Sequence, residues 1–159
     1  MPITAYTDII SLSRAKNYLR IDDTLTEDDI DITSMIKGAF LFMERYTNHI
    51  FINREFTQYV PPKIYNYPIT AIDGDSDFDF DNYYQRNYDK LYGPYGSYNP
   101  PVLTTYNAGY LEVSDVPDDF IQSALQIIKV WYYESQKEVN GQIIPMATRQ
   151  VLDTYRRFV

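Results

Sequence analysis

The sequence contains one set of side chains that could hold a hard metal ion. Aspartates alternate with other residues through the stretch DGDSDFDFD, in which the first aspartate is Asp73. If this stretch is extended, its carboxylates project from one face, and carboxylate oxygens are the ligands that Ca²⁺ prefers. The EF-hand pattern fails, because glycine occupies the second loop position and Tyr84 stands where the twelfth position needs glutamate. A solvated acidic segment is the favoured interpretation, and the candidate metal ligands are Asp75, Asp77 and Asp79.

Acid–base and nucleophilic chemistry has little support in the sequence. His49 is the only histidine, and the chain has no cysteine. A Ser/His/Asp triad or a transition-metal site needs more partners, and neither a GxSxG elbow nor a glycine-rich phosphate loop occurs. His49 falls near the end of a predicted helix, where a capping or surface histidine is expected. We therefore expect no enzymatic activity and no cofactor.

Tyrosine is unusually frequent, with 17 Tyr beside 8 Phe and a single Trp. Tyrosine offers a large contact area at low rotamer cost and a hydroxyl that can remain hydrated, so this enrichment suits interfaces; coding bias is the alternative explanation. The cluster that includes Tyr92, Tyr95 and Tyr98 lacks the interleaved Lys and Arg that binding of single-stranded nucleic acid needs. A protein interface is the simpler interpretation. The alternative function is a carbohydrate- or surface-binding module that uses this Tyr-rich segment.

Length and composition indicate a single domain, spanning residues 1–159, that is held together by packing alone. A chain of 159 residues with 45% hydrophobic residues can bury one modest core, and without cysteine it has no disulfides. The 14 Lys and Arg against 22 Asp and Glu give a net charge of −8, which disfavours binding to nucleic acid phosphates. No signal peptide and no 18-residue uncharged stretch is visible, so we expect synthesis in a cytosol and no membrane contact.

Hydrophobic periodicity places four helices around a β-rich middle. Apolar residues recur at helical spacing in four segments: about 11–20, 26–48, 116–139 and 146–157. The first helix is capped by Ser11 or Ser13 and the second by Thr26, and Gly38 in the second indicates close packing against another helix or a kink. The segment 51–113 has strand and turn patterns. The expected class is α+β, mainly α, as a small helical bundle with a β-rich hairpin or loop insertion.

Three separated stretches follow one another in an order that carries more information than any of them alone. They are SLSRAKNYLRIDDTLTEDDIDITSMIKGAFLFMERYTNHIF, TTYNAGYLEVSDVPDDFIQSALQIIKVWYYES and IPMATRQVLDTYRRF. The matching positions are Leu19, Arg20, Ile21, Asp22, Asp29, Ile32, Ile36, Ala39, Glu44, Tyr46, Thr47, Tyr106, Ala108, Gly109, Tyr110, Val116, Pro117, Ala124 and Trp131, with Tyr132 or Tyr133. Across nearly the whole chain this set resembles the siphophage-type head–tail connector, or adaptor, family of tailed bacteriophages.

The resemblance implies a non-catalytic virion protein at the head–tail interface, assembled in the host cytoplasm. Such a subunit forms a ring, expected to be dodecameric, between the portal protein and the tail or the next connector, a tail-completion or stopper protein. Genomic DNA would pass through the channel without specific binding. The resemblance places the expected portal contacts in the C-terminal segment: Arg149, Tyr155, Arg156, Arg157 and Phe158.

The segment from Asp73 to Pro101 departs from the family pattern, because it is longer and richer in Tyr and Asp. Contacts between neighbours in a cyclic ring join two different patches, so this segment is expected to reach an adjacent subunit. Tyr92, Tyr95 and Tyr98 are accordingly the expected contacts to a ring neighbour or to the tail.

Overall fold

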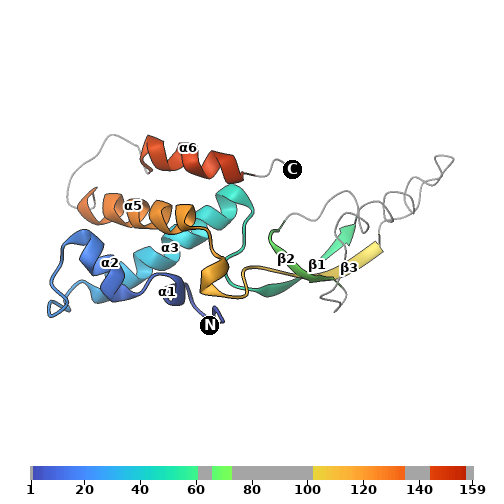
Figure 1. Ribbon diagram of the computed structural model, residues 1–159, viewed down its shortest axis with the longest axis horizontal. Helices are drawn as coiled ribbons and strands as arrows, with labels where there is room; N and C mark the ends of the chain where they lie inside the picture. Colours follow the sequence, from blue (N-terminus) through green and yellow to red (C-terminus); the bar gives the residue numbers. More distant parts are fainter. Residues whose placement is uncertain (1, 61–65, 73–101, 135–143, 157–159) are drawn as a thin grey trace.

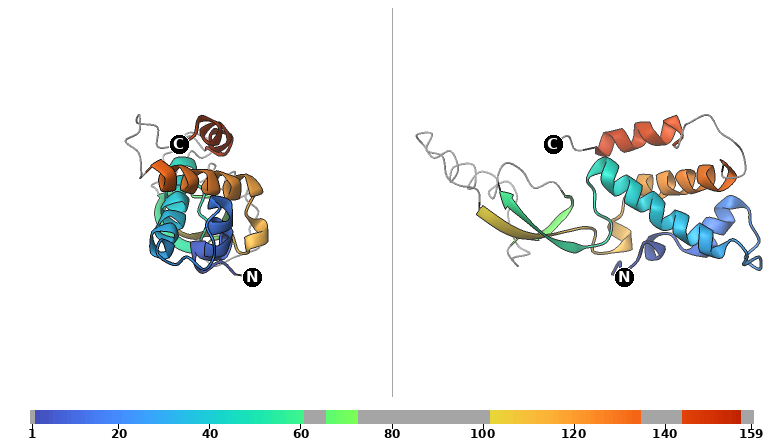
Figure 2. Two further views of the ribbon diagram at one scale, coloured as in Figure 1. Left: turned by 90° about the vertical axis from the view of Figure 1, so that its left-hand side faces the viewer. Right: turned by 180° about the vertical axis from the view of Figure 1, so that it is seen from behind.

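The computed structural model describes residues 2–60, 66–72, 102–134 and 144–156. Within these ranges the chain forms helices and strands in the order α1 (Tyr6–Ile9), α2 (Leu12–Leu19), α3 (Asp29–Thr47), β1 (Arg54–Val60), β2 (Ile69–Ile72), β3 (Val102–Ala108), the 3-10 helix η1 (Val113–Asp115), α5 (Asp118–Glu134) and α6 (Met146–Tyr155). The helices pack into one body, and the sheet extends from one end of it (Figures 1 and 2). The expected class, α+β and mainly α, is confirmed.

Local sequence signals explain where α2 begins and ends. The Ser11 hydroxyl accepts a hydrogen bond from the Arg14 backbone N–H at 3.2 Å, which is the N-cap interaction predicted from the sequence. The helix ends at Arg20, whose φ of 61° lies in the left-handed region. The short helix α1, which precedes α2, was not predicted from the sequence.

The predicted N-cap at Thr26 is wrong, because α3 begins three residues later at Asp29. The Thr26 carbonyl accepts a hydrogen bond from the Asp29 N–H at 3.3 Å, so these residues form a turn before the helix. The loop ahead of this turn is held by the buried ammonium of Lys16, which donates hydrogen bonds to the carbonyl oxygens of Asp23 and Leu25. Asp29 and Asp31 in the first turn of α3 complement the helix dipole.

The helical core forms where α3 packs along α5, with α1, α2 and α6 around them (Figure 1). Ile32, Ile36, Ala39, Phe40 and Met43 form the buried face of α3, and Phe40 contacts Phe51 with ring centroids 4.9 Å apart. Gly38 faces Trp131 of α5, and a Cβ atom at this glycine would lie 3.1 Å from Trp131 Cζ3. The close approach predicted from Gly38 is therefore confirmed, and its partner is an indole ring.

The sheet is antiparallel, with strand order β1-β3-β2. Arg54 pairs with Ala108 at the end near the helices, and Val60 pairs with Val102 at the far end. A small second core lies beside this sheet and consists of Ile50, Ile72, Tyr106 and Ala108, with Phe56 and Ile69 packed against it. The three strands lie inside the range predicted to be β-rich, although β1 begins at Arg54 rather than Phe51.

Substitutions of Gly38 test the packing between α3 and α5. Gly38→Ala should be close to neutral, because the gain of about 1 kcal/mol in helix propensity offsets the crowding against the half-buried Trp131 ring. Gly38→Val adds volume that this contact cannot accommodate and should lower the free energy of unfolding by about 1–3 kcal/mol. Urea denaturation followed by circular dichroism measures both values. A Val variant as stable as the Ala variant would show that Trp131 does not constrain this helix pair.

Candidate functional site: a pocket where the helices meet the sheet

The chain leaves α3 through a residue with left-handed backbone geometry and bonds at once to the segment that precedes β2. Asn48 has φ of 62°, and its N–H donates to the Glu44 carbonyl at 2.9 Å. The Tyr67 N–H donates to the Asn48 carbonyl at 3.0 Å, and the Ile50 N–H donates to the Tyr67 carbonyl at 2.7 Å. These bonds flank His49, so its backbone position at the junction is fixed.

The buried carboxylate of Glu44 holds residues 51–54, which connect α3 to β1. Glu44 is 5% exposed, and one of its oxygens accepts a hydrogen bond from the Phe51 N–H at 3.0 Å. Its other oxygen pairs with the Arg54 guanidinium at 2.9 Å. Burial of the nearby Tyr6 hydroxyl raises its pKa, and the negative charge of Glu44 raises this pKa further. The first residues of β1 are thus tied to the last turn of α3.

His49 is buried at this junction, with 5% of its surface exposed, so the expectation of a surface histidine is wrong; the C-cap of α3 is the preceding residue, Asn48. Its Nδ1 atom lies 3.1 Å from the Tyr110 hydroxyl, within hydrogen-bond distance. The imidazole ring also lies 5.2 Å from the Tyr67 ring, 5.1 Å from Phe120 and 5.8 Å from Tyr155, measured between centroids. The histidine was placed at the surface because its ring partners come from segments distant in sequence.

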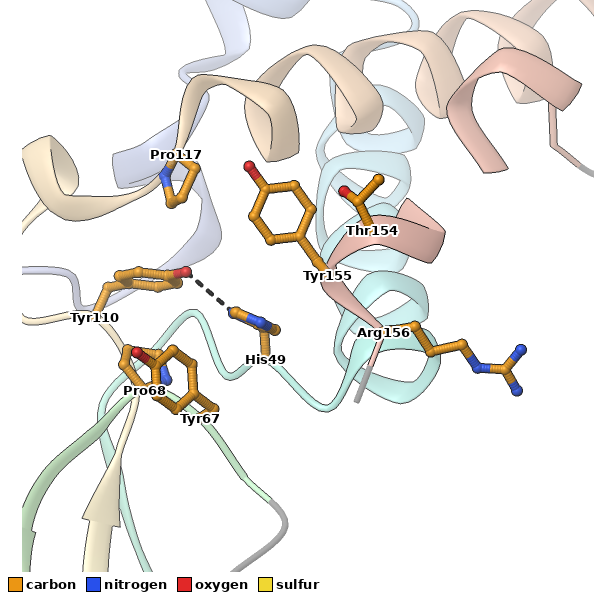
Figure 3. Close-up of a pocket in the computed structure, with 8 residues that line it drawn as sticks. All are labelled: His49, Tyr67, Pro68, Tyr110, Pro117, Thr154, Tyr155 and Arg156. Carbon is orange, nitrogen blue, oxygen red and sulfur yellow. Dashed lines mark hydrogen bonds between the residues drawn. The ribbon is translucent and has the colours of Figure 1, made fainter. Parts of the chain in front are cut away.

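A solvent-accessible pocket of about 420 Å³ opens beside His49. Figure 3 shows the side chains that line it: His49, Tyr67, Pro68, Tyr110, Pro117, Thr154, Tyr155 and Arg156. Rings and prolines form most of the wall, and none of these lining residues is a carboxylate. Walls of this kind suit an apolar or ring side chain presented by another protein.

The end of α6 supplies one side of this pocket. The Tyr155 ring packs on Phe120, with centroids 4.5 Å apart, and its hydroxyl donates a hydrogen bond to Asp119 at 2.9 Å. Burial, followed by this hydrogen bond, raises the pKa of Tyr155. Arg156 follows directly and places its guanidinium carbon 5.0 Å from the centre of the Tyr46 ring. In Figure 3 the guanidinium points away from His49, so Arg156 contributes its stem to the pocket and its charge to the outer surface.

Polar side chains of α6 form hydrogen bonds with Tyr46 on that outer surface. Its hydroxyl donates a hydrogen bond to the Asp153 carboxylate. A hydrogen bond with Tyr46 is also the main cause that raises the pKa of the Arg149 guanidinium, and Asp153 adds to it. Of the expected portal contacts, Arg149 and Tyr155 lie on α6, and Arg156 follows as the residue that ends this helix, beside the end of α3.

The remaining predicted site residues lie outside the described ranges. These are the portal candidates Arg157 and Phe158, the ring or tail candidates Tyr92, Tyr95 and Tyr98, and the metal candidates Asp75, Asp77 and Asp79. Within the described ranges, no three potential metal-ligating side chains lie close enough together to share an ion. None of the helices in those ranges combines the length and apolar character that crossing a bilayer requires.

Sequence reasoning did not foresee His49 and Tyr110 as pocket residues, although one signal pointed there. Gly109 has φ of 132°, and a Cβ atom at this position would lie 2.5 Å from the Asn53 Cα. Only glycine fits, and its N–H donates to the Pro68 carbonyl at 2.8 Å. The Gly-Tyr pair therefore directs the chain leaving β3 back toward His49, and the glycine at the end of this strand is the sequence signal for that turn.

No family model and no curated protein matches the sequence. Solved structures of similar fold include a chain of the neck of an empty gene transfer agent (GTA) particle computed with C6 symmetry, with a TM-score of 0.62 and 13% identity. A second is a chain of the virion of a native GTA particle, with a TM-score of 0.59 and 15% identity. In both cases the match covers 100% of this chain and 95% of the other chain. The chain therefore shares its fold, over its whole length, with chains of phage-like GTA particles.

Two substitutions separate the roles of the Tyr155 ring and hydroxyl. Tyr155→Phe removes the hydrogen bond to the exposed Asp119 and should cost less than about 1 kcal/mol in the free energy of unfolding. Tyr155→Ala removes a half-buried ring from Phe120 and His49 and should cost about 1–3 kcal/mol. Chemical denaturation of the full chain gives both numbers. Equal losses would mean that the hydroxyl, rather than the ring, holds the end of α6.

Proposed function

We propose that this chain is a structural head–tail connector, an adaptor subunit of a tailed phage or phage-like virion, and that it has no enzymatic activity. In this role it forms a ring between the portal and the tail or the next connector protein, and the ring extends the channel through which DNA passes. The proposal needs no cofactor.

The observation that carries the proposal is the likeness in fold to GTA neck and virion chains over the full length of this chain. The ordered sequence motifs support it independently, because they resemble adaptor proteins in the segments that form α2, α3, α5 and α6. One of the GTA necks was computed with C6 symmetry, and a dodecameric ring contains a six-fold axis, so the expected ring size is compatible with that symmetry.

The C-terminal helix is the proposed portal-facing element. Its last residue, Tyr155, contributes its ring to the pocket, and the next residue is an exposed cation, Arg156. An aromatic anchor beside an arginine is typical of the residues that dominate the energy of protein interfaces. The pocket offers a partner side chain a place to insert, while Arg149 and Arg156 contribute charge on the outer surface beside Tyr46.

Electron microscopy of particles made without this chain tests the role directly. A stop codon in its gene should give heads that are packaged with DNA or leaking, without attached tails, because the ring that joins the two parts is missing. Restoring the wild-type gene in trans is the control and should restore tailed particles. Normal tailed particles without the chain would rule out the connector role and favour the surface-binding alternative.

Charge substitutions test the portal-facing surface without damaging the fold. Removing α6 is unsuitable, because Leu152 of that helix is fully buried. Reversing the two exposed cations with Arg149→Glu and Arg156→Glu should instead weaken binding to the portal protein by about tenfold or more. Arg14→Glu with Lys129→Glu makes the same change in net charge at exposed positions of α2 and α5 and serves as the matched control. Equal affinity of both variants would place the portal contact elsewhere.

A further inference from the structure

The end of the helical body away from the sheet carries a dense set of carboxylates. This end, which we call the acidic tip, consists of Asp22, Asp23, Leu25, Glu27, Ile30 and Asp31 in the α2–α3 loop and the first turn of α3 (Figure 1). Four of these six residues are acidic, and all six are exposed. The tip therefore presents negative charge over a surface that no other described helix covers.

Buried and half-buried contacts hold the tip in one shape. Lys16, 2% exposed, donates to the carbonyl oxygens of Asp23 and Leu25 and pairs with the Asp29 carboxylate at 2.9 Å. From α5, Tyr132 donates its hydroxyl hydrogen to Asp28, and this bond is the main cause that raises the pKa of Tyr132 to about 12. A preorganised surface loses little conformational entropy when a partner binds it.

Two large apolar side chains stand exposed among these carboxylates. Leu25 is 58% exposed and Ile30 is 80% exposed. The helix dipole accounts for acidic residues at the start of α3, because carboxylates there are stabilised by the helix N-terminus. It does not account for an exposed leucine in the loop and an exposed isoleucine in the first turn of α3. Apolar groups within a charged rim are the usual composition of a protein interface.

The same helix carries a surface of the opposite charge further along. Lys37, Leu41 and Arg45 recur every four residues on α3, so they lie on one face and form what we call the basic stripe. Lys37 and Arg45 are exposed, and the half-buried Leu41 lies between them. Like the tip, the stripe combines charged and apolar side chains on one surface. Its charges are positive, whereas those of the tip are negative.

We propose that the acidic tip of one copy docks on the basic stripe of the next copy, with Leu25 and Ile30 packing beside Leu41. Glu27 and Asp31 then face Lys37 and Arg45 of the neighbour. Because tip and stripe are different patches, the contact is heterologous, and repeated rotation closes it into a ring. This inference rests on the proposed function, since it names the surfaces through which the copies of the ring meet.

Disulfide trapping tests the contact cleanly, because the chain has no cysteine of its own. The variant Leu25→Cys with Leu41→Cys is expressed as the full chain and incorporated into particles, which are oxidised and analysed under non-reducing conditions. The two positions cannot join within one copy: Lys16 holds Leu25 near Asp29, and Leu41 lies about 18 Å further along α3. A disulfide needs Cα atoms within about 7 Å. We expect a ladder of covalent dimers, trimers and larger species.

Two control variants make the outcome specific. Leu25→Cys alone should give no ladder, and Leu25→Cys with Leu111→Cys pairs the tip with an exposed residue of another surface and should give none either. Should Leu41→Cys fold poorly, Leu25→Cys with the exposed Lys37→Cys probes the same stripe. Particles that contain the double variant but only monomers overturn the inference and leave the proposed function standing. Dimers without larger species also overturn it. If the wild-type chain is absent from particles, both this inference and the proposed connector function are ruled out.

A charge exchange in the cysteine background gives a second, independent result. Glu27→Lys with Asp31→Lys should reduce the cross-linked fraction about tenfold, and so should Lys37→Glu with Arg45→Glu. Combining all four substitutions in one chain restores opposite charges across the contact and should recover the ladder. A combined variant that stays monomeric while its circular dichroism spectrum is native would overturn the pairing of tip and stripe.

Discussion

The fold depends on a buried carboxylate, Glu44, at the point where helix gives way to sheet. Its two oxygens are occupied by the Phe51 N–H and the Arg54 guanidinium, and only 5% of the residue is exposed. A buried carboxylate that loses such partners costs several kcal/mol. The start of β1 therefore cannot move from the end of α3 without leaving that charge unpaired. The position of β3, which pairs with β1, is fixed in turn.

The pocket follows from that constraint through the sheet. Arg54 of β1 pairs with Ala108 of β3, so fixing β1 also fixes where β3 ends. Gly109 then packs against the backbone of Asn53, and this path of the chain places the Tyr110 hydroxyl beside His49. The end of α6 completes the enclosure from the other side by packing Tyr155 on Phe120. The pocket is thus a product of long-range packing rather than of any one motif.

This origin explains what the sequence could and could not predict. Helical periodicity and the Ser11 cap depend on neighbours within a few residues, so α2 and the buried face of α3 could be predicted from the sequence. The prediction of Thr26 as the N-cap of α3 failed because Lys16 donates hydrogen bonds to the carbonyl oxygens of the preceding loop. No local sequence pattern reveals these bonds. His49 was misplaced for the same reason: its burial depends on rings from Tyr67, Tyr110 and Tyr155, which are distant in sequence. Local rules predicted the elements, but not the site that their packing creates.

Net charge conceals the property that matters most for assembly. The total of −8 suggests a uniformly acidic protein, yet exposed carboxylates dominate the surface at the start of α3, whereas the surface beside its end carries Arg149 and Arg156 together with Asp153. The 19 residues of α3 span about 28 Å, whereas salt at physiological strength screens exposed charges over about 8 Å. The two ends therefore act as independent electrostatic surfaces. The proposed ring subunit, which would also meet a different protein, needs such separate surfaces, because attraction at one must not depend on occupancy of the other.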